Sequence, residues 1–131
     1  MRIMIDTNVL VSALLFPSER MNKLIYKIVT DHTLVISSYV IEELLQVTCR
    51  KFKGKVETID QLLSQLPYEL VYTPKRPKAG LFEIRDETDY PVLYTAIADD
   101  VDLFITGDRD FEDLDLERPE ILTPSEFLNR Y

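Results

Sequence analysis

The chain has 131 residues, of which 46 % are hydrophobic and 29 % are charged, and its formal net charge at pH 7 is −8. We expect one domain spanning residues 1–131, because single cores most often hold about 100–150 residues. One cysteine and one histidine exclude an internal disulfide and zinc sites built from Cys and His. No secretory signal or membrane span is evident, which predicts a cytoplasmic protein without a membrane partner.

Acidic and basic residues are segregated along the chain. Residues 46–80 hold seven Lys or Arg against three Asp or Glu, whereas residues 81–120 hold three Lys or Arg against fourteen Asp or Glu. The acidic stretch is compatible with a solubilising face or with a carboxylate-rich metal site. Any metal must be held by oxygen, which favours Mg²⁺ or Mn²⁺.

Strands and helices are predicted to alternate in the first half of the chain. Apolar residues 2–5 predict a short buried strand, which ends at Asp6. Apolar spacings of three and four predict a helix over about residues 19–31, and a second strand follows over residues 33–37. Ser37 or Ser38 can cap the next helix. Candidates for the core or for a dimer interface are Leu10, Val11, Leu14, Leu15 and Phe16.

The second half continues the same alternation, with one long Pro-rich loop over residues 74–80. Its predicted elements are a helix over 56–66, an edge strand over 68–73, a helix from Pro91 to about 99, strands over 103–106 and 120–123, and a closing helix over 124–130. This order predicts an α/β fold, a three-layer α/β/α sandwich around a central, mainly parallel sheet of about four to five strands.

Acidic residues follow the predicted strands. Asp6 follows the first strand, Asp108 and Asp110 follow the strand over 103–106, and Asp89 precedes a helix. Each one alone can be a turn residue or a helix cap. Together they should converge at the carboxyl ends of the strands, where they would repel one another and attract a divalent cation. Such a cluster indicates phosphoryl transfer or phosphodiester hydrolysis.

Four segments carry a resemblance to a known family. In the same order along the chain, they are similar to segments of PIN-domain ribonucleases, particularly the VapC-like toxins of prokaryotic toxin–antitoxin pairs. The segments are Ile5-Asp6-Thr7-Asn8-Val9, Ser37-Ser38 through Glu43-Leu44, Asp89 through Ala96-Ile97-Ala98, and Leu103-Phe104-Ile105-Thr106-Gly107-Asp108-Arg109-Asp110-Phe111.

The resemblance implies a set of site residues. The metal-binding and catalytic acids would be Asp6, Glu43, Asp89, Asp108 and Asp110, and supporting polar residues would be Thr7, Asn8 and Thr106. Helical periodicity does not choose between Glu42 and Glu43, and the resemblance favours Glu43 because it precedes a leucine. Asp86 is an alternative to Asp89, and Asp108 and Asp110 need not both touch the metal.

The activity implied by the resemblance is RNA hydrolysis by water that one or two Mg²⁺ or Mn²⁺ ions activate. Toxins of this type usually pair with a small antitoxin and often form homodimers. We further expect the basic residues to contact the RNA backbone. These residues are Arg50, Lys51, Lys53, Lys55, Lys75, Arg76 and Lys78.

Two rival functions fit parts of the sequence. A PIN-fold module without activity could bind RNA or protein, although such modules typically lose one or more of the acids. A phosphatase of the haloacid-dehalogenase type would need an acid two residues after Asp6, where this chain has Asn8. Cys49 lies at the edge of an apolar stripe, and we expect it to be a small core residue.

Overall fold

The computed structural model describes residues 1–112 and 114–131, and its centre is a five-stranded sheet. All pairings are parallel, and the strand order is β3-β2-β1-β4-β5. This confirms the predicted fold class. The strands are β1 (Arg2–Ile5), β2 (Thr33–Ser37), β3 (Glu69–Val71), β4 (Leu103–Ile105) and β5 (Glu120–Leu122).

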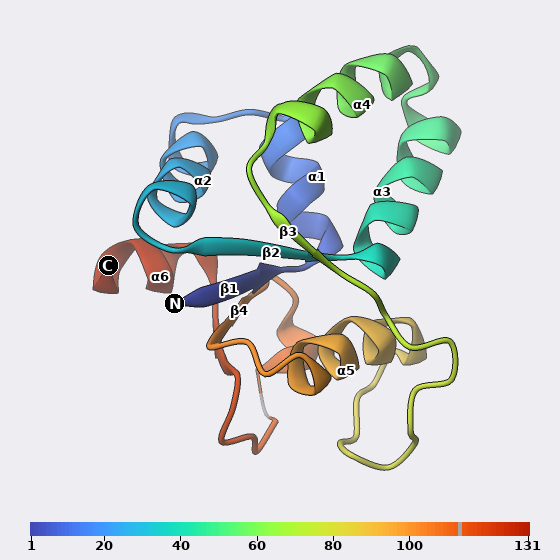
Figure 1. Ribbon diagram of the computed structural model, residues 1–131, viewed down its shortest axis with the longest axis vertical. Helices are drawn as coiled ribbons and strands as arrows, with labels where there is room; N and C mark the ends of the chain where they lie inside the picture. The colour runs from blue at the N-terminus through green and yellow to red at the C-terminus, as the bar shows by residue number, and fades with distance from the viewer. Residues whose placement is uncertain (113) are drawn as a thin grey trace.

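Helices cover both faces of the sheet. In Figure 1, α1 to α4 lie on one side of the strands and α5 lies on the other, and α6 packs against α2. The helices are α1 (Thr7–Leu15), α2 (Glu19–Asp31), α3 (Ser38–Lys51), α4 (Val56–Gln65), α5 (Tyr90–Ala98) and α6 (Pro124–Arg130), with short 3₁₀ turns η1 (Lys53–Lys55), η2 (Glu87–Asp89) and η3 (Arg109–Phe111).

The core forms from the apolar strands and the inner faces of the helices. Residues 3–5 and 103–105 are buried, as their apolar runs predict. Cys49 is exposed, so the prediction that it belongs to the core was wrong. It lies on α3 directly after Thr48, which takes the buried position and donates to the carbonyl of Leu44. Within the described residues, no helix is long and apolar enough to cross a membrane.

The strand order creates a switch point between β1 and β4. From β1 the chain moves outward to β2 and β3, and from β3 it returns through α5 to β4 on the other side of β1. The segments that leave β1 and β4 therefore diverge at the carboxyl ends of these two strands. Ligands of open α/β sheets bind in the crevice that such a divergence leaves. Asp6 follows β1 and Asp108 lies three residues after β4, so both acids lie at this crevice.

Candidate metal centre

Asp6 is a buried carboxylate that is held in place from two sides. It is the N-cap of α1, and its Oδ1 accepts a hydrogen bond from the backbone N of Val9 at 3.0 Å. Its Oδ2 accepts from the hydroxyl of Thr106, beyond the end of β4. Burial raises the pKa of Asp6 to about 6, although the two hydrogen bonds lower it. The charges of Asp108 and Glu43 add to the rise. Asp6 is therefore fixed in position before any ligand arrives.

Thr106 links Asp6 to the acidic turn after β4. While its hydroxyl donates to Asp6, its Oγ1 accepts from the backbone N of Asp108 at 3.0 Å. Asp108 is in turn the N-cap of η3, because its Oδ1 accepts from the backbone N of Asp110 at 2.9 Å. Phe111 is 2 % exposed and packs edge-on against Phe104, with ring centroids 5.2 Å apart. Phe111 therefore packs under the acidic turn and anchors it to the sheet.

Glu43 reaches the same place from α3. Ser37 caps this helix at the end of β2, and Glu43 lies in its second turn. The hydroxyl of Thr7 donates to its Oε1 at 2.6 Å, so α1 and α3 are joined by a polar contact at the crevice. Glu42 instead lines a separate cavity beside Thr73 and Lys75. Of the two neighbouring glutamates, the fold brings Glu43 to Asp6.

Asp89 completes the cluster from the start of α5. Asp89, Asp108 and Asp110 each have one carboxylate oxygen that lies within 4.8 Å of the oxygens of the other two. Burial raises the pKa of Asp89 to about 7, with further contributions from the charges of Asp108, Asp86 and Asp110 and from a hydrogen bond to Asp108. Its Oδ2 is buried and has no hydrogen-bond partner within the described part of the chain.

A cavity of about 210 Å³ joins these residues. It is lined by four of the five predicted acids together with Thr7 and Asn8. Asp110 is not among the lining residues, but one of its carboxylate oxygens lies within 4.8 Å of oxygens of Asp89 and Asp108. Asp86, the alternative to Asp89, also lines the cavity, but Thr88 donates two hydrogen bonds to its Oδ1. These bonds lower the pKa of Asp86 below its usual value, in contrast to Asp89. Of the pair, Asp89 is the acid with a buried oxygen, Oδ2, that lacks a partner among the described residues.

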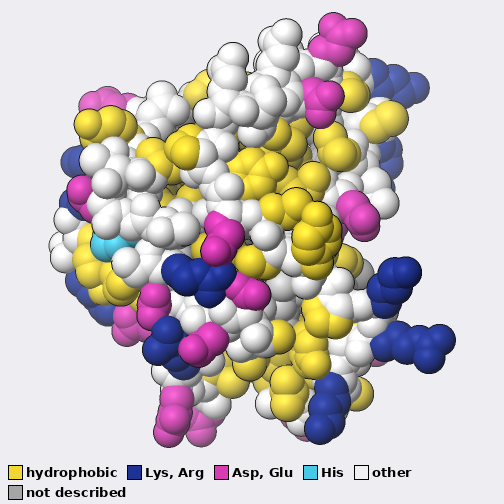
Figure 2. Space-filling model, in the orientation of Figure 1, with side chains coloured by type: hydrophobic (Ala, Val, Ile, Leu, Met, Phe, Trp, Pro, Cys, Tyr) yellow, Lys and Arg dark blue, Asp and Glu magenta, His cyan; other side chains and the backbone are white. Residues whose placement is uncertain are grey.

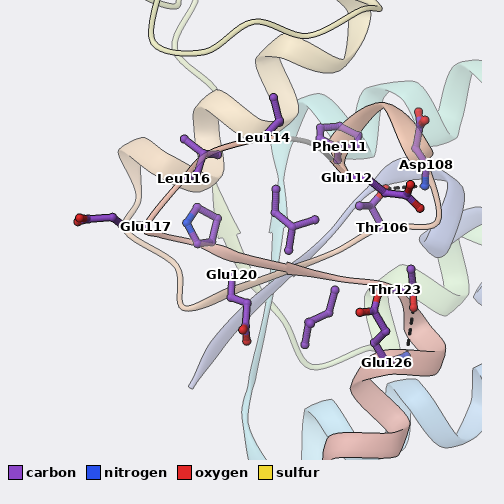
Figure 3. Close-up of a pocket in the computed structure, with 13 residues that line it drawn as sticks. Thr106, Asp108, Phe111, Glu112, Leu114, Leu116, Glu117, Glu120, Thr123 and Glu126 are labelled. Carbon is purple, nitrogen blue, oxygen red and sulfur yellow. Dashed lines mark hydrogen bonds between the residues drawn. The ribbon is translucent and has the colours of Figure 1, made fainter.

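A second cavity, of about 440 Å³, adjoins the cluster on the side of β5. Figure 3 shows that Thr106 and Asp108 close one end of it, while Leu114 and Leu116 form part of its wall. Glu112, Glu117, Glu120 and Glu126 also lie along this cavity, and no Lys or Arg is among its lining residues. The surroundings of Asp108 are therefore acidic on both sides.

The predicted RNA-contacting cations do not form one group. Arg50, Lys51, Lys53 and Lys55 lie at the end of α3 and in η1, at least about 10 Å along the helix from Glu43. Lys75, Arg76 and Lys78 lie in the loop before α5, and Lys75 lines a cavity next to the cluster. In Figure 1 the two segments lie on opposite sides of the edge where the strands end.

Sequence reasoning did not identify Tyr39 as part of this region. Its hydroxyl donates to the backbone carbonyl of Thr88 at 3.1 Å, which ties α3 to the turn that carries Asp89. Burial and the charges of Glu43, Asp89 and Asp86 raise its pKa. The available signal was its position four residues before Glu43, which places both side chains on one face of α3.

The donor set fits a hard divalent cation. Its members are carboxylates, which are the ligands that Mg²⁺ and Mn²⁺ prefer, and Lys and Arg form no ion pair with them in the described residues. A buried carboxylate oxygen without a partner is costly, and a bound cation would satisfy it. The unpaired Oδ2 of Asp89 is therefore the observation that most directly favours a metal at this cluster.

Comparison with known proteins gives a family and a fold. A family model described as "PIN domain" matches residues 2–110. Among solved structures, the chain is similar to a chain of VapBC2 from Rickettsia felis bound to a DNA fragment from their promoter. The identity is 20 %, the TM-score is 0.72, and the match covers 93 % of this chain and 97 % of that one. No match is found among curated protein sequences.

Proposed function

The chain belongs to the PIN-domain family, and on this premise we propose that it is an endoribonuclease that depends on Mg²⁺ or Mn²⁺. The observation that carries the proposal is the convergence of Asp6, Glu43, Asp89 and Asp108 on one cavity, with Asp110 beside them. This site lies at the switch point of the sheet, where open α/β folds bind ligands. Neither rival from the sequence is favoured by a comparable observation.

Asp89, Asp108 and Asp110 would hold the ion, and Asp6 and Glu43 would complete the acidic wall around it. When bound, the ion would activate water and stabilise the negative charge that develops on the leaving oxygen. The chain itself supplies orientation. Thr106 fixes Asp6 and the backbone of Asp108, and Thr7 fixes Glu43, so these carboxylates do not have to reorganise when substrate binds.

The test is hydrolysis of an RNA pool, with DNA of the same sequences in parallel, because attack by water does not require a 2′-hydroxyl. We expect cleavage of RNA with Mn²⁺ or Mg²⁺, products with 5′-phosphate and 3′-hydroxyl ends, and no cleavage with EDTA or in Asp6→Asn. Asp60→Asn, a change of an exposed acid on α4, is the matched control and should cleave normally. Hydrolysis that persists in both EDTA and Asp6→Asn would refute the proposal.

We also propose that the protein is the toxin of a toxin–antitoxin pair. The support is its likeness to VapBC2. Expression in a bacterial host should arrest growth, and co-expression of a small protein encoded beside it should restore growth through formation of a complex. Asp108→Asn should not arrest growth. Growth arrest by this variant at the same protein level would contradict a toxic effect through hydrolysis.

A further inference from the structure

A third cavity, of about 640 Å³, lies behind the turn that carries Asp89. Its walls are mainly apolar and come from the loop over residues 74–89 and from the start of α5. The apolar wall residues are Pro77, Ala79, Phe82, Ile84, Tyr90 and Pro91. The ring of Phe82 stacks on that of Tyr90, with centroids 4.4 Å apart and planes inclined by 17°. We call this cavity the aromatic pocket.

Tyr90 fixes the loop that forms the aromatic pocket. Its hydroxyl donates to the backbone carbonyl of Lys78 and accepts from the backbone N of Leu81 at 3.3 Å. The loop is therefore held against α5 at two points, and the pocket exists before a ligand binds. Leu81 is 48 % exposed beside it, so apolar surface continues beyond the pocket.

The aromatic pocket and the metal centre share one segment of chain as their common wall. Asp86, Thr88, Asp89 and Val92 line the metal-centre cavity, whereas Glu87, Tyr90 and Pro91 line the aromatic pocket. A further cavity, of about 260 Å³, borders the pocket because Pro77 and Pro91 line both, and it contains Lys75 and Tyr39. Tyr39 in turn bonds to Thr88. The cavity with the carboxylates, the cavity with Lys75 and the aromatic pocket therefore lie around one segment of chain, residues 86–91.

The charge of the loop beside the aromatic pocket differs from that of the cavity on the side of β5. Lys75, Arg76 and Lys78 are exposed in the loop, although the whole chain has a net charge of −8. Figure 2 shows Lys and Arg side chains that project from the lower right of the molecule beside a field of apolar side chains. Glu83 and Glu87 are also exposed at the pocket, and carboxylates can accept hydrogen bonds from the amino groups of bases.

Cations beside an aromatic face are the features that bind single-stranded nucleic acid, since the cations contact phosphates and the rings stack on bases. We infer that the aromatic pocket binds an unpaired base of the RNA strand whose phosphodiester lies at the carboxylates, with Lys75, Arg76 and Lys78 contacting the intervening backbone. This inference rests on the proposed function, from which it takes RNA as the ligand. It implies that the enzyme acts on unpaired RNA, because a base in a duplex cannot enter the pocket.

The test is binding of a fluorescent single-stranded RNA and of a duplex of the same sequence, measured by anisotropy in EDTA so that cleavage plays no part. Phe82→Leu keeps apolar volume but removes the ring. We expect it to weaken single-strand binding by about 5- to 100-fold, which is the usual contribution of one stacked base, and to leave duplex binding unchanged. Phe82→Trp should retain single-strand affinity. Tyr26→Leu, a change of a ring that is 70 % exposed on α2, is the matched control.

A second arm changes the RNA instead of the protein and does not depend on how the variant folds. One abasic nucleotide is moved along the single strand. At one position it should weaken binding to the unchanged protein, and at that position Phe82→Leu should cause no additional loss. Equal losses of affinity for single strand and duplex in Phe82→Leu would overturn the inference. Unchanged affinity in Phe82→Leu would also overturn it, and would favour the aromatic pocket as a docking surface for a protein. Intact base-specific binding without hydrolysis would instead contradict only the nuclease proposal.

Discussion

The two ends of the sheet carry similar numbers of acids but differ in whether these acids form ion pairs. At the amino ends of the strands, Arg2 pairs with Glu69 and Asp99, and Arg118 pairs with Asp100 and Asp102. Arg130 pairs with Glu120 at the start of β5. At the carboxyl ends, the acids of the candidate metal centre have no ion pair with Lys or Arg across residues 1–112 and 114–131. Their neighbours are hydroxyls, backbone N–H groups and one another.

This difference shows that acidity alone does not mark a site. The stretch over residues 81–120 holds fourteen acids, and only some of them take part in either arrangement. Four of them form ion pairs at one end of the sheet, and three lie in the candidate metal centre at the other. What distinguishes the second group is that its charge is left uncompensated by the chain. The predictions that follow test this distinction, beginning with the largest expected effect.

Asp89→Asn should abolish most of the activity. Loss of a metal ligand removes several kcal/mol of transition-state stabilisation, which corresponds to roughly a thousandfold in rate. The same change should raise the melting temperature in EDTA, because a neutral amide relieves repulsion with Asp108 and Asp110 and can donate to them. We expect Mn²⁺ to raise the melting temperature of the unchanged protein, and this increase should be lost in the variant. Single-turnover cleavage and thermal unfolding measure these effects.

Asp102→Asn is the matched control at the amino ends of the strands. Its carboxylate accepts from the backbone N of Arg2 and from the side chain of Arg118, and an exposed pair of this kind contributes about 0–1 kcal/mol. We expect a small loss of stability with unchanged activity and an unchanged Mn²⁺ effect. If the two variants lost activity equally, the distinction between the two ends would not hold.

Thr106→Val should have an intermediate effect. The shape of the buried side chain is kept, but Asp6 Oδ2 and the backbone N of Asp108 lose their common partner. Residues that orient metal ligands typically contribute 10- to 100-fold to metal affinity, so Mn²⁺ binding should weaken by about this factor. Thr106→Ser, which retains the hydroxyl, should bind Mn²⁺ like the unchanged protein. Calorimetric titration with Mn²⁺ distinguishes these outcomes, and equal affinity in the valine variant would contradict the orienting role.

The smallest predicted effect is a pH dependence that the metal reverses. In EDTA, the folded protein takes up protons at Asp89 and Asp6, whose pKa values of about 7 and 6 lie above the ordinary value of 3.8. Stability from these two groups is therefore lost as the pH rises through 6 and 7, and it increases as the pH falls toward 4. With Mn²⁺, protons compete with the ion, so the stabilisation by metal should shrink over the same fall in pH. Melting curves of the unchanged protein and of Asp89→Asn isolate the contribution of Asp89, which should be absent from the variant, whereas that of Asp6 should remain.

Much of this architecture is visible in the sequence because it depends on local patterns. Apolar runs ending in an acid located β1 with Asp6 and β4 with Asp108, and parallel strands bring such ends together. The expectation for Cys49 was wrong because a residue at the border of a stripe can face either way, and packing placed Thr48 inward instead. The predicted strand over residues 68–73 is shortened to β3, whose pairing partner is β2 alone.

Other features depend on how distant helices meet, and periodicity does not encode this. The proximity of Glu43 to Asp6 follows from the contact between α1 and α3, in which Thr7 meets Glu43. The direction of α3 also separates the basic residues into two groups, because the helix begins at the site and carries Arg50 and Lys51 away from it. The two basic segments, which belong to one basic stretch of the sequence, therefore lie apart in the fold.

The bond between Thr106 and Asp6 joins residues 100 positions apart and has a consequence for synthesis. A growing chain that has not yet produced β4 contains Asp6, Glu43 and Asp89 but lacks Thr106, Asp108 and Asp110. The hydroxyl that fixes Asp6 and two of the three clustered carboxylates arrive only in the last quarter of the chain. A chain that ends before β4 therefore lacks most of the acidic cluster, and under the proposed function we expect such a chain not to hydrolyse RNA.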